Sequence, residues 1–372
     1  MKMTRRAWSL SFLAAAACTR KGPRGFPGYA LVSTAGENSV AVVDLAAFRL
    51  ARKIDVGAPP ATVAIGSDRS FVLTPSTGSV HVLDRKLHHA GSRKFADQLS
   101  DIRLSGDGKL LVAIAAAPPE FLIADARTLQ VIRKEKLDAA PVAIDAASLP
   151  YAAVSTAHTL DLFQLETGRG SRVQLPGEIG PVRFRADTQL LLAANLGDRS
   201  LTALNVPALQ VIADLPLAMK PENLCFNANG GQLFVSGDGM DAVAIVFPYH
   251  TLEVEQTILA GRDPGVMACS EDPAYLFVAS HSGSDVCILG VDNRKMIGIV
   301  EVGVRPSYIT VTPDSQYALI LDELSGDMAV VHVTAIRVTA EANRTKSGAA
   351  LFTKIPVGSR PVHAAIVPKP LV

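Results

Sequence analysis

The sequence is short of aromatic residues, of net charge and of catalytic motifs, and each shortage narrows what the protein can be. Aromatic residues make up only 5% of the chain, so a core must be packed with valine, isoleucine, leucine and alanine. The formal net charge of +1 supplies no long-range field, and we therefore expect no nucleic-acid partner. The sequence contains no GxSxG elbow, phosphate-binding loop, CxxC motif or paired catalytic acids. These absences favour a protein that is not an enzyme.

What the chain does contain is a repeat. New copies begin at intervals of 40 to 42 residues, at Tyr29, Phe71, Leu111, Tyr151, Leu191, Leu233, Tyr275 and Tyr317. Each copy has four short apolar runs rich in β-branched residues, with glycine and proline at the junctions and almost no helical pattern. A fixed period near forty residues with four strands per copy is typical of a β-propeller. The sequence thus predicts an all-β propeller of four-stranded blades.

The crossing from one copy to the next is the best-preserved part of the repeat. It reads VGVRPSYITVTPD from Val302, and the copies open with YALVST at Tyr29, YAAVST at Tyr151 and YLFVAS at Tyr275. These stretches resemble the YVTN family of bacterial β-propeller repeats, and the resemblance covers residues 29–368. Such repeats occur in proteins of many roles, so the resemblance implies a fold and not a function.

Counting the strands predicts eight blades. Runs suited to the innermost strand begin near Ala61, Asp101, Val142, Val182, Asn223, Val266, Tyr308 and His363. The first copy, at Tyr29, has no innermost run before it, and the run at His363 has no copy after it. Pairing these two ends of the chain would close the ring and leave no open sheet edge. We therefore expect one domain over residues 29–368; seven blades, with a degenerate copy at Phe71, is the alternative.

Residues 1–17 have the pattern of a signal peptide. Lys2, Arg5 and Arg6 precede an apolar run of 11 residues, which is too short to span a bilayer. Small residues then lead to Cys18, which resembles the lipobox of bacterial lipoproteins, and residues 4–8 resemble a twin-arginine export signal. These resemblances imply lipidation at Cys18, a flexible tether over residues 18–28, and a periplasmic or outer-membrane protein that contacts the membrane only through its lipid. Simple secretion is the alternative.

The other three cysteines, Cys225, Cys269 and Cys287, cannot all be paired because their number is odd. Cys269 and Cys287 fall on strands separated by another strand of the same blade, which is too far for a disulfide. We interpret all three as buried free thiols, and the sequence shows no metal-binding motif.

Candidate ligand-binding residues lie in the turns and crossings expected at the mouth of the central channel. Arg262, Arg305 and Arg360 recur just before the crossing proline, so they would form a cationic arc that binds a carboxylate or phosphate, or pairs with nearby acids. The other candidates are the histidines and acids of the same loops, for which turn capping is the simpler interpretation: His158, His281, His363, Asp241, Asp285 and Asp327.

Three functions follow from this pattern. The favoured one is a monomeric binding or scaffold protein for a protein, glycan or small ligand, with no cofactor. Eight blades and an export signal also resemble haem-binding propellers related to cytochrome-type nitrite reductases. That resemblance implies a tetrapyrrole cofactor and a histidine on the channel axis, with His158, His281 and His363 as candidates. A propeller-type lactone hydrolase is the third, and would need acids and a histidine converging on the channel.

Overall fold

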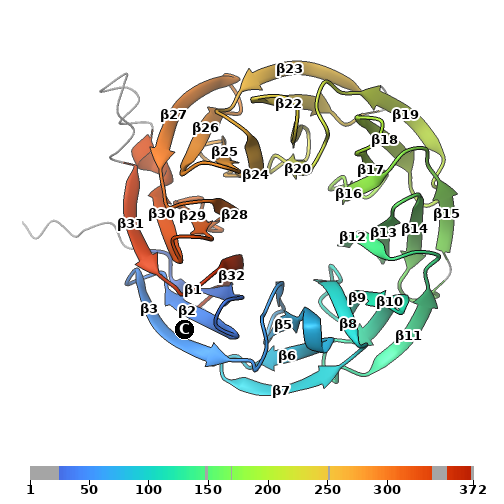
Figure 1. The fold of residues 1–372 in the computed structure, drawn as a ribbon, viewed down its shortest axis with the longest axis horizontal. Coiled ribbons are helices and arrows are strands. Elements are labelled where there is room, and N and C mark those ends of the chain that lie inside the picture. The colour runs from blue at the N-terminus through green and yellow to red at the C-terminus, as the bar shows by residue number, and fades with distance from the viewer. Residues whose placement is uncertain (1–24, 147–149, 169, 250–251, 337–349, 370–372) are drawn as a thin grey trace, which may run out of the picture.

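The computed structural model describes residues 25–146, 150–168, 170–249, 252–336 and 350–369, which form eight four-stranded antiparallel sheets in a ring (Figure 1). The prediction of an all-β propeller with eight blades is confirmed, and the seven-blade alternative is wrong because the copy at Phe71 forms a complete sheet. Within the described residues, no helix has the length and apolar character needed to cross a bilayer. The predicted signal peptide and Cys18 lie outside these residues.

Blades 1 to 4 follow the ring in chain order, and each is given from its innermost strand outward. Blade 1 comprises β32 (Pro361–Pro368), β1 (Gly28–Thr34), β2 (Ser39–Asp44) and β3 (Arg49–Asp55). Blade 2 comprises β4 (Val63–Ile65), β5 (Ser70–Thr74), β6 (Ser79–Leu83) and β7 (His89–Lys94), with the 3₁₀ turn η1 (Pro75–Thr77) after β5. Blade 3 comprises β8 (Gln98–Leu104), β9 (Leu110–Ala117), β10 (Pro119–Asp125) and β11 (Val131–Lys136). Blade 4 comprises β12 (Pro141–Ala146), β13 (Tyr151–Thr156), β14 (Thr159–Gln164) and β15 (Gly170–Gln174).

Blades 5 to 8 repeat the same order. Blade 5 comprises β16 (Ile179–Phe184), β17 (Leu190–Asn195), β18 (Ser200–Asn205) and β19 (Val211–Pro216). Blade 6 comprises β20 (Asn223–Phe226), β21 (Leu233–Ser236), β22 (Ala242–Phe247) and β23 (Glu253–Leu259). Blade 7 comprises β24 (Pro264–Cys269), β25 (Tyr275–Ser280), β26 (Asp285–Gly290) and β27 (Lys295–Glu301). Blade 8 comprises β28 (Pro306–Val311), β29 (Tyr317–Asp322), β30 (Asp327–His332) and β31 (Leu351–Pro356).

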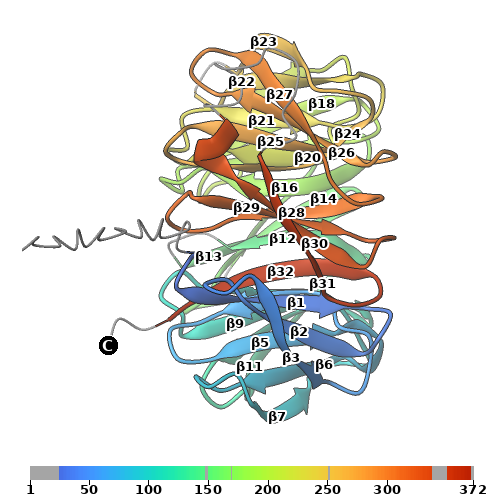
Figure 2. The ribbon, with the colours of Figure 1, turned by 90° about the vertical axis from the view of Figure 1, so that its left-hand side faces the viewer.

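The two ends of the chain close the ring in blade 1, as the strand count predicted. β32 pairs antiparallel with β1, with Tyr29 opposite Val367 and Leu31 opposite Ala365, and Figure 2 shows the two strands side by side. The pairing gives β1 a ladder on both sides, so no apolar edge of this blade is left open. Phe26, which the sequence analysis placed in the tether, is buried against Leu45 and Tyr317.

The hydrophobic core lies between the blades. The second and third strands of each blade are almost wholly buried, because their side chains meet those of the neighbouring blades on both faces, whereas outer strands such as β3 are mostly exposed. Aliphatic residues supply most of this packing, as the low aromatic content requires. One aromatic pair joins blades 3 and 4, where the rings of Phe121 and Phe163 stack with centroids 4.2 Å apart.

The crossings between blades and the turns between second and third strands lie together on one face of the ring. The backbone N–H of His281, in the turn of blade 7, donates to the carbonyl of Asp263 in the crossing before it, at 2.8 Å. The N–H of Arg305, in the next crossing, donates to the carbonyl of Gly283 in that same turn, at 3.0 Å. We call this the crossing face.

Candidate functional site

The innermost strands bring a set of polar side chains together around the axis of the ring. We call the set the axial cluster; its members are Thr62, Asp101, Arg103, Asp145, Arg183, Cys225, Cys269, Tyr308 and His363. Every blade contributes at least one member, because Thr62 directly precedes β4 and the others lie on the remaining seven innermost strands. No further strand covers these side chains, and each is partly exposed. Eight segments that are far apart in the sequence therefore place polar side chains at the axis.

Asp101 links two neighbouring blades at the axis. Its Oδ1 accepts a hydrogen bond from the Thr62 hydroxyl at 2.6 Å and another from Arg103 Nη1 at 2.8 Å. Thr62 belongs to blade 2, while Asp101 and Arg103 lie two residues apart on β8 of blade 3. Because successive strand residues alternate in direction, this spacing puts both charged side chains on the same side of β8.

A second ion pair joins blades 4 and 5. Arg183 Nη1 lies 3.4 Å from Asp145 Oδ1, and the N–H of Phe184 donates to Asp145 Oδ2 at 2.8 Å. Burial raises the pKa of Asp145, while the charge of Arg183 and, more weakly, that of Arg103 oppose the rise. The side chains of Arg103 and Arg183 remain 31% and 40% exposed. Each guanidinium carries five N–H donors but meets a single carboxylate, so each keeps donors for a further acceptor.

His363 and Tyr308 lie together on the opposite side of the ring. Their ring centroids are 4.5 Å apart, and the N–H of Val63 donates to His363 Nδ1 at 3.3 Å, which places the imidazole hydrogen on Nε2. Burial, with a smaller contribution from the charge of Arg103, lowers the pKa of His363 to about 4. The imidazole is therefore neutral at pH 7. Burial also raises the pKa of the Tyr308 hydroxyl, which stays protonated.

Two cysteines face each other across blades 6 and 7. Cys225 on β20 and Cys269 on β24 have their Sγ atoms 3.9 Å apart. All three described cysteines are free, as predicted, and β25 separates β24 from β26 as predicted. The prediction that all three thiols are buried is wrong for Cys225 and Cys269, because innermost strands have one uncovered face. Only Cys287, in the core of blade 7, is buried, and burial raises the pKa of its thiol to about 12.

Of the nine residues that the sequence analysis selected, only His363 belongs to the axial cluster. The exposed ring of His158 hydrogen bonds through Nδ1 to the carbonyl of Gly177 at 2.7 Å, and His281 is exposed on its turn. Asp241 Oδ1 accepts the N–H of Asp263 at 2.9 Å, which is a bond that fixes a crossing. Asp285, opposite Glu301, begins β26, and Asp327 lies opposite Asp322 at the start of β30.

The predicted arginine arc is paired with an acid of the same face. Arg305 Nε and Arg360 Nε lie 3.4 Å and 3.5 Å from the two carboxylate oxygens of Glu323. Arg262 contributes its carbonyl, which accepts the hydroxyl of Ser280 at 2.9 Å. The sequence analysis left open whether these arginines bind a ligand or pair with nearby acids; Arg305 and Arg360 pair with a loop acid.

The residues that sequence reasoning missed had a signal in the repeat. Arg103, Asp145, Arg183, Cys225 and Cys269 follow one another at steps of 42, 38, 42 and 44 residues along the innermost runs. Each looks like an isolated polar residue in an apolar strand. Only their recurrence at the repeat period places them in one ring.

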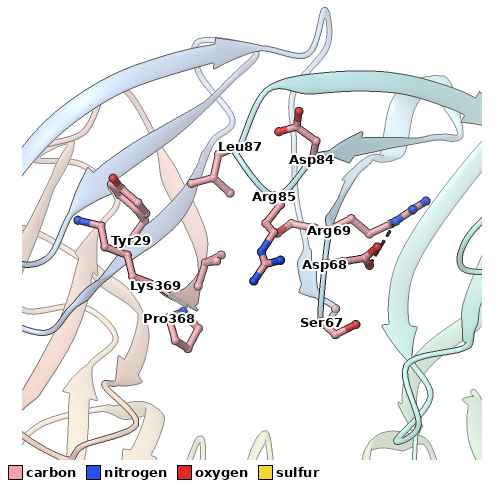
Figure 3. A pocket seen from close by; sticks show the side chains of 12 residues that line it. Tyr29, Ser67, Asp68, Arg69, Asp84, Arg85, Leu87, Pro368 and Lys369 are labelled. Carbon is pink, nitrogen blue, oxygen red and sulfur yellow. Dashed lines mark ion pairs between the residues drawn. The ribbon is translucent and has the colours of Figure 1, made fainter. Parts of the chain in front are cut away.

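A separate pocket of about 270 Å³ lies between blades 1 and 2, away from the crossings (Figure 3). It is bordered by the turn before β5, the turn after β6 and the end of β32, and Arg85 extends between them. Lys369 lies 4.6 Å from the ring centre of Tyr29 and 3.7 Å from Asp44, and Arg69 lies 3.5 Å from Asp68. Two of the three cations of this pocket therefore already have anionic partners.

Comparison with known proteins shows the fold. No protein-family model and no curated protein matches the chain. The solved structure "Dihydro-heme d1 dehydrogenase NirN in complex with DHE" is 13% identical with a TM-score of 0.76, covering 91% of this chain and 75% of that one. A functionally unknown protein from Desulfotomaculum acetoxidans DSM 771 is 12% identical with a TM-score of 0.61, covering 91% and 98%. Kuenenia stuttgartiensis hydrazine synthase is 18% identical with a TM-score of 0.57, covering 73% and 95%.

The likeness is one of fold. At identities of 12–18% the comparison shows a similar fold and transfers no function. The YVTN resemblance rests on the repeat alone. Among the residues that the structure describes, no group of three or more histidine, cysteine or acidic side chains is arranged to hold a metal ion.

Proposed function

We propose that the protein is an exported, lipid-anchored propeller that binds a small carboxylate-bearing ligand at the axis of its ring. The observation that carries the proposal is the pair Arg103 and Arg183, which project from innermost strands with spare donors and partial exposure. Guanidinium groups bind carboxylates by two parallel hydrogen bonds, and such charge-assisted bonds are stronger in a partly desolvated site. The axial arginines also pair with acids, but they are less exposed, at 31% and 40%, than Arg305 and Arg360 on the crossing face, at 46% and 62%.

The remaining members of the cluster would shape that site. Tyr308 and His363 offer two flat rings, tilted by 40° to each other, that could contact a planar ligand. Asp101 and Asp145 hold the arginines in place and would repel a ligand whose carboxylates are placed wrongly. We expect a ligand that is planar, carries at least two carboxylates and is small enough to lie within the ring.

A tetrapyrrole is the second candidate, since its flat macrocycle bears carboxylates and can bring a metal ion. His363 is neutral at pH 7, and moving its ring hydrogen from Nε2 to Nδ1, with loss of the bond from Val63, would free Nε2 as an axial iron ligand. The likeness in fold to the dihydro-haem d1 dehydrogenase favours this candidate.

Binding titrations distinguish the two candidates. Terephthalate, a planar dicarboxylate, would be titrated by calorimetry, and haemin and metal-free protoporphyrin IX by absorbance, into wild type, Arg183→Gln and the crossing-face control Arg305→Gln. We expect Arg183→Gln to weaken binding of at least one probe by about 10- to 100-fold, which is the value of one charged hydrogen bond, and Arg305→Gln to change it little. A tetrapyrrole site would also lose its haemin spectrum in His363→Ala. Failure of all three probes to bind, or equal weakening of binding by Arg305→Gln and Arg183→Gln, would reject an axial carboxylate site.

Export and anchoring are tested separately. Intact-mass analysis of protein isolated from the cell envelope should show a chain that begins at Cys18 and carries acyl groups. An unmodified chain starting elsewhere would instead support simple secretion.

A further inference from the structure

Two neighbouring blades each contribute one cysteine thiol to the axis of the ring. Cys225 and Cys269 come from separate copies of the repeat, 44 residues apart, and both lie on innermost strands. Their Sγ atoms are 3.9 Å apart and both side chains are partly exposed. Both side chains also pack against the core between blades 6 and 7 that encloses Cys287, but unlike Cys287 they keep part of their surface exposed.

The separation of the two sulfurs is closer to that of a dithiolate metal site than to that of a disulfide. With metal–sulfur bonds of about 2.3 Å, a linear two-coordinate ion places its sulfurs about 4.6 Å apart, and a bent one places them nearer. The observed 3.9 Å is about 0.7 Å short of the linear value. A disulfide bond is about 2.05 Å long, so forming one would bring the sulfurs about 1.9 Å closer. An ion therefore fits between the thiols with less movement of β20 and β24 than a disulfide needs.

A partly exposed cation lies on the innermost strand beside β20. This cation is Arg183 on β16, a strand that contacts β20, and its guanidinium is 40% exposed. A bound thiolate pair would thus have positive charge beside it, which offsets the excess negative charge of two sulfurs around a monovalent ion.

We propose that Cys225 and Cys269 form a binding site for a soft monovalent cation of the Cu(I) type, held between two thiolates at the ring axis. Thiolates select soft ions such as Cu(I). Within the described part of the chain no third histidine, cysteine or acid completes a set around them, which disfavours the four-ligand geometry of zinc. Binding forms two metal–sulfur bonds and releases the thiol protons to solvent, and the oxidation state of the ion does not change. This site shares Arg183 with the carboxylate site proposed above, so its test changes only cysteines and leaves both axial arginines in place.

The test is a competition for Cu(I). The full chain carrying Cys18→Ser would be titrated anaerobically with Cu(I) against bathocuproine disulfonate, with ascorbate present to keep copper reduced. We expect one tightly bound Cu(I) per chain. Cys225→Ser and Cys269→Ser should each lose that ion at competitor concentrations that leave the parent loaded, and Cys287→Ser should keep it. Circular dichroism of each variant would establish that the propeller is intact.

X-ray absorption of the copper-loaded parent gives a readout that needs no variant. Two sulfur neighbours at about 2.3 Å or less are expected. Nitrogen or oxygen neighbours, no copper bound above the level of the Cys225→Ser/Cys269→Ser double variant, or loss of copper in Cys287→Ser would each overturn the proposal. Isolation of the chain from its own cells with a 225–269 disulfide would also overturn it, and would assign the pair to a covalent link between blades.

Discussion

Asp322 in blade 8 occupies the position that Asn195 occupies in blade 5. Each ends the second strand of its blade and lies opposite the first residue of the third strand. The amide of Asn195 donates to the carbonyl of Pro176 at 2.6 Å and so ties its blade to the preceding crossing. Asp322 is fully buried, and neither of its carboxyl oxygens has a hydrogen-bond partner at normal geometry. Burial and then the nearby carboxylate of Asp327 raise the pKa of Asp322 to about 8.

Replacing Asp322 by asparagine should therefore stabilise the fold at pH 8. The ordinary pKa of an aspartate is 3.8, so the folded state favours the protonated acid, and Asp322 makes the protein progressively less stable as pH rises from about 4 to about 8. Asp322→Asn removes this dependence and supplies the amide that works at position 195. We expect a gain of about 2 kcal/mol at pH 8 and little change at pH 4, measured by urea unfolding. An equal change in the free energy of unfolding at pH 4 and pH 8 would contradict the raised pKa of Asp322.

Two glycines in the crossings, Gly303 against Asp322 and Gly177 against Asn195, should not tolerate a side chain. A Cβ at Gly303 would lie 2.6 Å from Asp322 Cβ, and one at Gly177 would lie 2.3 Å from Asn195 Oδ1. We expect Gly303→Ala to cost about 1–3 kcal/mol, because the crossing would have to shift away from the strand. Gly57→Ala is a useful comparison: its Cβ would meet nothing within 4 Å, so its positive φ is the expected source of any cost. Thermal unfolding of the two variants separates crowding from backbone strain.

His363 should remain neutral well below the usual pKa of histidine. Since burial lowers its pKa from 6.5 to about 4, its contribution to stability is present above pH 6.5 and is lost as pH falls toward 4. Nitrogen-15 NMR of the His363 imidazole, titrated from pH 8 to pH 4, should show no protonation near pH 6.5. Protonation of this ring near pH 6.5 would show that His363 is solvated.

Closure of the ring by β32 should be required for stable folding. A chain ending at Arg360 lacks β32 and leaves β1 with an unpaired, apolar edge. We expect it to aggregate or to lose its cooperative unfolding transition, while a chain ending at Lys369 should unfold like the parent. Size-exclusion chromatography and calorimetry would report both. Full stability without β32 would show that the remaining strands of blade 1 suffice.

The fold could be predicted from the sequence because the repeat encodes it many times. Weak copies such as the one at Phe71 were supported by stronger ones, and the missing innermost run before Tyr29 predicted closure by the run at His363. The axial cluster could not be predicted in the same way. Whether a polar residue of an innermost run turns toward the axis depends on strand register, and the irregular pairing around Val182 or Met267 shifts that register by local bulges that the sequence does not mark.

Most of the predicted ligand-binding residues lie on the crossing face because loop polarity is visible in a sequence, whereas the partners of each loop residue are not. Glu323 is one of many loop acids, and nothing in its spacing indicates that it lies between Arg305 and Arg360.

The most direct test of an axial binding site is to observe the arginine side chains themselves. Nitrogen-15 NMR of the guanidinium Nε–H groups would be recorded while terephthalate or haemin is added, with Arg103→Gln and Arg183→Gln used to assign the signals. The signals of Arg103 and Arg183 should shift in proportion to bound ligand, while those of Arg305 and Arg360 should stay in place. Shifts confined to Arg305 and Arg360 would place the site on the crossing face and rule out binding at the axis.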